Sequence, residues 1–209
     1  MKLGIITDVH ESVENLQAAL KRLDEVNVER IISIGDFSET GSRLEETCEA
    51  LLAAGVEGVW GNHDFGICED ARKGVQLKFG SAVAEFAKRQ QPELWVDDCL
   101  FMHVEPWLDP ESLTDLWYLD GLADNEKKRS RIFGRRDFRI AFSGHFHTWF
   151  AASEQGMIDW NGQAEIVLGD SRYFVVIDAC LNGAYALFDT ETQALTPSSI
   201  DRESYTDQS

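Results

Sequence analysis

The feature that most constrains this chain is its first strand-like segment and the two polar side chains that end it. The apolar run at residues 2–7 leads directly into Asp8, and His10 follows two positions later. Side chains at positions i and i+2 of an extended strand point the same way. We therefore expect Asp8 and His10 to leave the end of a buried strand side by side, as a pair of metal ligands would.

The same pattern recurs after four further apolar runs. Each of them ends in residues that commonly bind metals or form tight turns: Gly35-Asp36, Gly61-Asn62-His63-Asp64, His103 and Gly144-His145-Phe146-His147. All five histidines of the chain lie just after such a run, which scattered surface histidines would not do. A single Asp, Asn or His at such a place is usually a turn, cap or core residue. Only the combination predicts a metal site.

The order of these runs predicts the fold class. Residues 2–7, 30–34 and 56–60 are typical of buried strands, and the segments between them have the apolar spacing of helices. This β-α-β-α-β rhythm predicts right-handed crossovers and a parallel sheet. In such sheets ligands bind beyond the carboxyl ends of the strands, which is where the polar motifs lie.

The rest of the chain has a different character. We expect a helix at 75–91, a strand at 99–103, an irregular stretch at 104–122 and a basic helix or loop at 125–137. Short strands then follow at about 139–143, 148–152, 164–168, 173–178 and 184–188. The sequence predicts a single domain over residues 1–195 and a polar C-terminal tail at 196–209.

Taken in order, the motifs resemble those of the calcineurin-like metallophosphoesterase family, in particular its small bacterial-type phosphodiesterase branch. They run from Asp8 to His147 and so cover about two thirds of the chain. The resemblance implies an α/β fold of two facing mixed β-sheets flanked by helices, an α/β/β/α sandwich. It also implies a metal-dependent phosphoesterase that hydrolyses a phosphodiester through a dinuclear metal site with a bridging hydroxide nucleophile.

The resemblance assigns roles to individual residues. Seven of them would hold two metal ions: Asp8, His10 and His147 on one ion, Asn62, His103 and His145 on the other, and Asp36 between the two. His63 would act as the general acid and would be held in orientation by Asp64. A mixed set of imidazole, carboxylate and amide ligands suits Mn, Fe, Zn, Co or Ni better than Ca or Mg, and we expect Mn to serve in vitro.

The chain departs from the family pattern in two places. The position after the lone histidine is commonly Gly, and here it is Val104, followed by Glu105, whose carboxylate could disfavour a very anionic substrate. The protein-phosphatase branch carries an Arg after its Gly-Asp motif, and here Phe37 follows Asp36. Enzymes that act on monoester dianions tend to place an Arg fork on the phosphoryl oxygens. Charge balance therefore favours a diester, and Arg172 is the one candidate for a substrate-binding fork.

Two further segments leave alternatives open. Residues 127–139 contain seven of the nineteen basic residues, which could recruit phosphate near the site or balance acidic neighbours. Residues 105–118 form an aromatic insert that could cover a nucleoside-like group, contact a second copy of the chain, or pack in the core.

Composition excludes several other classes of function. A formal net charge of −18 argues against a general nucleic-acid-binding or acidic-membrane surface, so we expect a small-molecule phosphate ester as the partner. The four cysteines lack metal-binding or disulfide spacing, and no signal peptide or membrane span is visible, which predicts a cytoplasmic protein. The rival functions are a phosphomonoesterase with the same site and a non-catalytic scaffold on the same fold.

Overall fold

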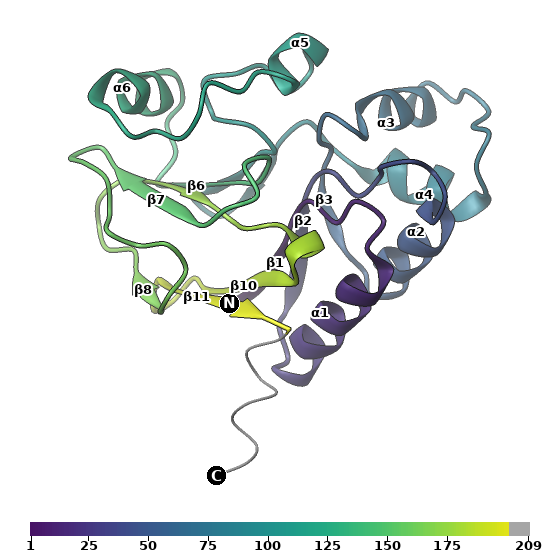
Figure 1. Cartoon of the computed structure of the whole chain (residues 1–209), viewed down its shortest axis with the longest axis horizontal. Helices are drawn as coiled ribbons and strands as arrows, with labels where there is room; N and C mark the ends of the chain where they lie inside the picture. Colours follow the sequence, from purple (N-terminus) through teal and green to yellow (C-terminus); the bar gives the residue numbers. More distant parts are fainter. Residues whose placement is uncertain (201–209) are drawn as a thin grey trace.

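The computed structural model, which describes residues 1–200, contains two β-sheets that face each other (Figure 1). The strands of the first sheet follow the order β3 (Glu57–Val59), β2 (Arg30–Ile34), β1 (Lys2–Ile6), β10 (Ala184–Asp189), β11 (Ala194–Ser199) and β8 (Ile166–Val167). Those of the second follow the order β4 (Leu94–Val96), β5 (Cys99–Phe101), β6 (Ile140–Ser143), β9 (Tyr173–Val176) and β7 (Phe150–Ser153). Each sheet combines parallel and antiparallel pairs.

Helices cover the outer faces of both sheets. On the side of the first sheet lie α1 (Val13–Glu25), α2 (Leu44–Ala53), α3 (Phe65–Arg72) and α4 (Ser81–Arg89), and α6 (Glu126–Arg135) lies on the second (Figure 1). The apolar layer between the sheets includes Ile5, Ile34, Phe142 and Val175, all fully buried. Two further apolar clusters join the helices to the outer faces. The predicted α/β/β/α sandwich is confirmed.

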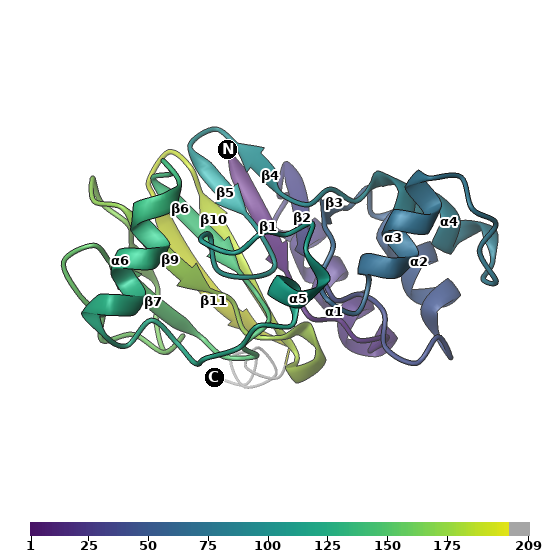
Figure 2. The same cartoon turned by 90° about the horizontal axis from the view of Figure 1, so that it is seen from above.

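The strand directions place one end of each sheet together. β1, β2 and β3 run parallel to one another, and so do β5, β6 and β9. A short 3₁₀ turn, η1 (Cys180–Asn182), follows β9 and leads the chain back into β10. Seen from above, α5 (Leu113–Leu116) lies between the half of the molecule that carries α6 and the half that carries α3 and α4 (Figure 2). The polar motifs follow the carboxyl ends of these parallel strands.

The helices after β3 differ from the prediction. The sequence predicts one helix at 75–91, whereas the structure has α3 immediately after the third polar motif and α4 only from Ser81. Gly74 adopts a left-handed φ of 73° just after α3, a common way for a helix to end. Glu45 of α2 accepts a hydrogen bond from the backbone N–H of Ala82 at 3.0 Å. Glu45 therefore caps the start of α4 from another helix, a contact that no local pattern contains.

The predicted boundary of the domain is too early. β11 extends to Ser199, so residues 196–199, which the sequence assigns to a polar tail, pair with β10. Only Leu195 of this strand is fully buried, which leaves little apolar signal. Pro197 is compatible with β11 because β8 pairs only with Ala194 and Leu195, so the rest of that edge is open. The remainder of the predicted tail, residues 201–209, lies outside the described residues.

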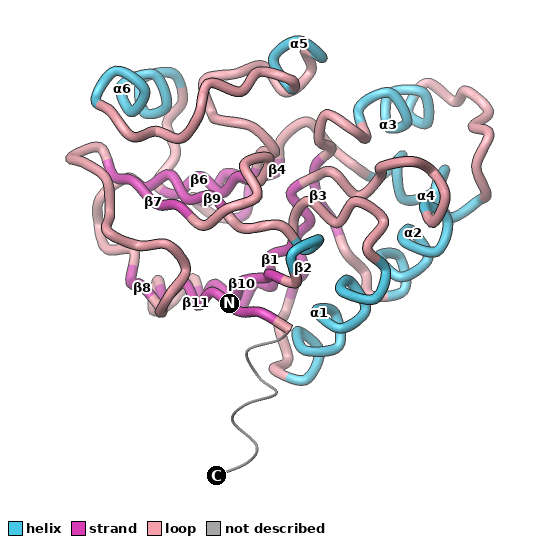
Figure 3. Tube along the Cα trace, in the orientation of Figure 1, coloured by secondary structure: helices cyan, strands magenta, loops and turns pink. Residues whose placement is uncertain are grey.

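Two short elements, β4 and α5, lie in segments for which the sequence predicts no helix or strand. β4 has three residues and α5 has four, and α5 lies inside the stretch at 104–122 that we predict to be irregular. Most of the chain between β5 and α6 is loop (Figure 3). None of the helices within residues 1–200 combines the length and apolarity needed to cross a membrane.

Replacing Glu45 with Ala should lower the free energy of unfolding by about 1 kcal/mol, the usual cost of losing a capping side chain. The reason is that the backbone N–H of Ala82 loses its acceptor. Urea unfolding followed by circular dichroism measures the change. Glu49→Ala, at an exposed position of the same helix, is the matched control and should stay within about 0.5 kcal/mol of wild type. Equal stability of the two variants would show that Glu45 does not cap α4.

Candidate metal centre

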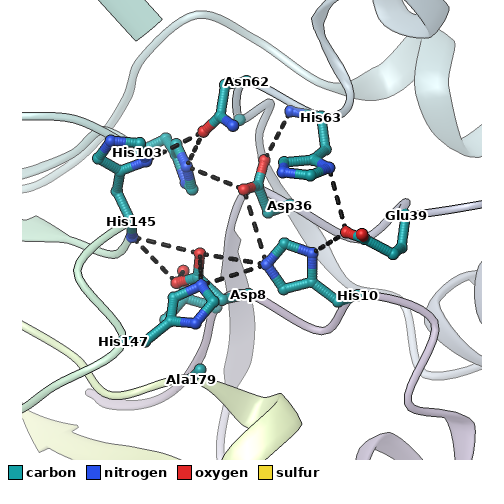
Figure 4. Close-up of polar contacts among 12 residues, drawn as sticks. Asp8, His10, Asp36, Glu39, Asn62, His63, His103, His145, His147 and Ala179 are labelled. Carbon is teal, nitrogen blue, oxygen red and sulfur yellow. Dashed lines mark hydrogen bonds and ion pairs between the residues drawn. The ribbon is translucent and has the colours of Figure 1, made fainter. Parts of the chain in front are cut away.

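Five loops that follow parallel strands meet at one edge of the sandwich and bring the polar motifs together (Figure 4). Backbone hydrogen bonds fix the first two loops to each other: the Asp8 N–H donates to the Gly35 carbonyl at 3.0 Å, and the His10 N–H donates to the Asp36 carbonyl at 2.9 Å. All seven predicted ligands lie in this cluster: Asp8, His10, Asp36, Asn62, His103, His145 and His147.

Asp8 organises the first group of ligands. Its buried carboxylate accepts hydrogen bonds from the Thr7 hydroxyl at 2.7 Å and from the backbone N–H of His145 at 3.0 Å. His147 Nε2 lies 3.2 Å from Asp8 Oδ1, and 3.2 Å separates the Nε2 atoms of His10 and His147. One ligand atom from each of Asp8, His10 and His147 lies within 4.8 Å of the other two. This is the set predicted for the first ion.

Asp36 organises the second group. The residue is 2% exposed, and its Oδ2 lies 3.3 Å from His103 Nε2. Asn62 Oδ1 lies 2.9 Å from His103 Nε2 and 3.0 Å from His145 Nδ1. Asp36 Oδ2 is also 3.8 Å from His10 Nε2, an atom of the first group. Asp36 thus lies between the two groups, where the sequence predicts the shared ligand.

His103 has a fixed orientation and interacts closely with Asp36. Its Nδ1 lies 2.8 Å from the Ile34 carbonyl, so that nitrogen carries the proton and Nε2 faces Asp36. Burial alone would lower the pKa of His103, but Asp36 outweighs burial and raises the pKa to about 10. Burial alone would raise the pKa of Asp36, but His103 outweighs it and lowers the pKa to about 2. Asp36 and His103 therefore stabilise each other's charged forms.

The donor set fits divalent transition-metal ions. Imidazole nitrogens, carboxylates and an amide oxygen converge at distances from which they could share an ion, and mixed nitrogen and oxygen sites of this kind suit Mn, Fe, Zn, Co and Ni. A third set of close ligand atoms comes from His10, Asp36 and His63. Distance alone therefore does not separate His63 from the ligands, and its role depends on its other contacts.

Glu39, which the sequence analysis does not single out, connects His63 to the metal cluster. Glu39 Oε2 lies 3.1 Å from His63 Nδ1 and 2.8 Å from His10 Nδ1 (Figure 4). One carboxylate therefore holds the Nδ1 atoms of both rings and leaves their Nε2 atoms free to face a metal or a substrate. The available signal is the position of Glu39, three residues after Asp36 and in the same loop.

Glu11 fixes the loop that carries Glu39. It is 6% exposed and follows His10 with a left-handed φ of 58°. Its carboxylate accepts hydrogen bonds from the backbone N–H groups of Glu39, Gly41 and Arg43 at 2.9, 2.6 and 2.8 Å. The first loop therefore positions the partner of His63 as well as two metal ligands.

Asp64 has a different role from the predicted one. Its carboxylate is fully buried and accepts from the backbone N–H groups of Ser38 at 2.9 Å and Gly61 at 3.1 Å, and from the Ser38 hydroxyl at 2.8 Å. These contacts join the loop after β2 to the loop after β3. Glu39, and not Asp64, contacts the His63 ring, so the orientation predicted for Asp64 belongs to Glu39.

Arg172 does not reach this cluster, and the prediction that it binds substrate there is wrong. It precedes Tyr173, which pairs with Ile140 at the start of β6, whereas His145 follows the end of β6. Its guanidinium donates to the backbone carbonyls of Phe138 at 2.8 Å and Phe133 at 2.9 Å. Arg172 therefore ties the end of α6 to the second sheet, at the edge away from the metal centre.

The basic segment 127–139 is also engaged elsewhere. Five of its seven basic side chains have partners outside the ligand cluster: Lys128 and Arg131 with Asp120, Arg135 with the Trp107 carbonyl, Arg136 with Glu93, and Arg139 with Asp98. Three of the four partners, Asp120, Glu93 and Asp98, are acidic residues. This favours the second alternative, a helix and loop that balance acidic neighbours, over phosphate recruitment.

Glu105 is not free to face a substrate. It is 2% exposed, and its Oε2 accepts a hydrogen bond from the Trp107 indole at 2.8 Å. Burial raises the pKa of its carboxyl group. Glu105 therefore holds the Trp107 indole through this hydrogen bond. Its contacts do not support the idea that it repels anionic substrates at the site.

Comparisons with known proteins place the chain in one family. Residues 1–180 match the family described as the calcineurin-like phosphoesterase superfamily domain. An uncharacterized protein of Methanocaldococcus jannaschii is 22% identical over 209 residues, which cover 90% of this chain and 82% of that protein.

Solved structures are similar over nearly the whole chain. A metallophosphoesterase from Sphaerobacter thermophilus has a TM-score of 0.75 at 21% identity and covers 96% of this chain and 88% of its own. A structure described as a novel archaeal phosphodiesterase has a TM-score of 0.56 at 14% identity and covers 95% of this chain and 99% of its own. These likenesses show a shared fold.

Gly144→Ala should remove metal binding without removing a ligand. A Cβ at this position would lie 2.0 Å from Thr7 Oγ1 and 2.5 Å from Asp8 Oδ2, closer than atoms can approach, so the Asp8 carboxylate must move. Titration with Mn²⁺ followed by elemental analysis should show the loss of at least one ion per chain. Gly134→Ala is the matched control, because its Cβ would meet no atom within 4 Å. Wild-type metal content in Gly144→Ala would show that Asp8 tolerates displacement.

Proposed function

Because the chain belongs to the calcineurin-like phosphoesterase superfamily, we propose that it hydrolyses a phosphodiester at the cluster centred on Asp36. One observation carries the proposal. The seven predicted ligands converge from five loops. Beside them, the Glu39 carboxylate holds both the His63 ring and the ring of the ligand His10. A structural metal site would have no use for this additional imidazole–carboxylate pair.

The residues divide into two sets of metal ligands. Asp8, His10 and His147 would hold one divalent transition-metal ion and Asn62, His103 and His145 a second, with Asp36 shared. When bound, such ions lower the pKa of water toward neutrality and neutralise the phosphoryl oxygens. Mn²⁺ is our proposal for assays in vitro. We also propose a cytoplasmic location, which the four cysteines support, since each is a free thiol.

His63 would supply the proton for the leaving alcohol. Its Nδ1 is held by Glu39 at 3.1 Å, so Nε2 is the nitrogen that can donate. The ring is also 26% exposed, which leaves it accessible to a substrate at the mouth of the site. A general acid in this position contributes about 10²–10⁴-fold to the rate. Glu39 keeps the ring in one tautomer and one orientation while the proton moves.

The charges around the cluster support a diester over a monoester. None of the arginine and lysine contacts described in residues 1–200 reaches the seven ligands, and Arg172 lies at the opposite edge. A monoester dianion would therefore find no guanidinium fork. A diester carries a single negative charge, which the ions can balance.

His63→Ala should keep its metals and lose activity, whereas Asp36→Ala should lose metal. For His63→Ala we expect a loss in kcat of about 10²–10⁴-fold on alkyl esters and a smaller loss on nitrophenyl esters, because good leaving groups need little protonation. Elemental analysis and steady-state kinetics measure the two effects. Loss of metal in His63→Ala would make His63 a ligand, as the grouping with His10 and Asp36 allows. Full metal occupancy in Asp36→Ala would show that Asp36 is not shared between the two ions.

The ratio of kcat/KM for bis-nitrophenyl phosphate to that for nitrophenyl phosphate, at matched metal and pH, should exceed one. Arg172→Ala should leave this ratio unchanged, because its guanidinium binds the end of α6. A preference for the monoester would assign the site to a phosphomonoesterase. No turnover of either ester with Mn, Fe, Zn, Co or Ni would favour the scaffold function.

A further inference from the structure

An aromatic strap, defined here as residues 105–119, passes beside His63, the proposed general acid at the metal centre. It follows the loop that carries His103 and includes α5. Figure 1 shows α5 above the sheets, and Figure 2 shows it near the carboxyl end of β1. The strap brings Trp117 to His63, with 5.2 Å between the ring centroids and 45° between the ring planes.

Contacts with the rest of the protein hold the strap in place. Leu116 is fully buried in the core beneath the first sheet's helices. The Trp60 indole donates to the Pro110 carbonyl at 2.8 Å. Trp107 packs edge-on against Tyr118 at 5.3 Å, and the Arg131 guanidinium lies 4.4 Å from the Trp107 ring centroid. The strap is therefore a preorganised platform, and core packing accounts for Leu108 and Leu116.

Trp117 is one of four exposed apolar residues of the strap, with Leu113, Tyr118 and Leu119, and its ring lies against His63. The residue is 55% exposed, although it stands between the buried Leu116 and the supported Tyr118. A large indole that faces solvent beside a proposed general acid is available to a substrate. Because His63 would protonate the leaving alcohol, whatever lies against Trp117 is attached to the leaving side of the phosphorus.

We infer that Trp117 is a subsite for the leaving group, and that the leaving alcohol carries a planar aromatic ring that stacks on the indole. This inference rests on the proposed function. In the reaction, water adds to phosphorus and the P–O bond to the leaving alcohol breaks. His63 gives its proton to that oxygen and recovers one from the attacking water. The products are a phosphate monoester and an aromatic-bearing alcohol.

The charge of the strap indicates the character of this ring. Residues 105–124 contain six Asp and Glu and no Lys or Arg. An additional phosphate on the leaving side would meet these carboxylates, and the neighbouring Arg131 and Lys128 are already paired with Asp120, so a polyphosphate or a nucleic-acid strand fits poorly. An uncharged ring fits, since stacking on an indole needs no ionic partner.

The test separates the ring from the acidity of the leaving group. Methyl phosphodiesters with a phenyl or a hexafluoroisopropyl leaving group provide a planar and a non-planar alcohol of similar acidity. We expect wild-type protein loaded with Mn²⁺ to prefer the phenyl ester. Trp117→Ala should lower kcat/KM for the phenyl ester by about 5- to 150-fold, the range for loss of one aromatic stacking contact, and leave the hexafluoroisopropyl ester within about twofold. Trp117→Phe should restore most of the phenyl preference.

Trp95→Ala is the matched control. Trp95 is also exposed, at 42%, and lies in a surface hollow with Phe138 and Arg172, at the edge away from the cluster. Its replacement should leave both esters unchanged. Circular dichroism and metal content establish that each variant is folded and loaded.

Each outcome has a distinct meaning. An equal loss on both esters in Trp117→Ala would show that the indole acts through His63 and is no subsite. No loss on either ester would overturn the inference and leave the exposed indole to a protein contact. Both results would leave the proposed phosphodiesterase intact. Absence of wild-type turnover on both esters would overturn the proposed function and this inference together.

Discussion

Two buried carboxylates, Asp8 and Asp36, impose the condition that the rest of the site meets. An ionised carboxylate out of water costs several kcal/mol unless hydrogen bonds and opposite charges compensate for it. Asp8 is compensated by the Thr7 hydroxyl and the His145 N–H. Asp36 is compensated by the backbone N–H of His63 at 3.0 Å and by the His103 ring. Apart from Thr7, these partners belong to other loops, so the loops must converge for the carboxylates to remain charged.

Convergence of this kind strains the backbone. Six non-glycine residues of the site loops have a left-handed φ between 45° and 69°: Asp8, His10, Glu11, Asp36, His145 and His147. This conformation is uncommon outside glycine, and such strain is found where a functional arrangement requires it. Close approach restricts other positions to glycine. A Cβ on Gly61 would lie 2.0 Å from Asp36 Oδ1, so the motif glycines leave room for the ligand carboxylates.

The sequence predicts which polar residues come together, because each of them follows a buried strand and the ends of parallel strands meet. The order of the apolar runs before Val59 also predicts the parallel sheet and its crossovers. What the sequence does not reveal depends on contacts between distant residues or on very short elements. Glu39 resembles any exposed glutamate until the fold places His63 beside it. The strand β11 carries a proline and one fully buried side chain, and pairing with β10 decides its conformation.

The distribution of positive charge explains why an apolar contact becomes important for recognition. The basic segment lies over the second sheet, where Arg136 pairs with Glu93 and Arg139 pairs with Asp98. Arg172 caps the end of α6. The ligand cluster has no comparable arginine among its described contacts, so the bound ions would provide its positive charge and would act on the phosphoryl oxygens alone. The organic part of a substrate must then be recognised by contacts that do not depend on charge. Trp117, which is 55% exposed and lies 5.2 Å from the His63 ring, offers an apolar surface for such a contact.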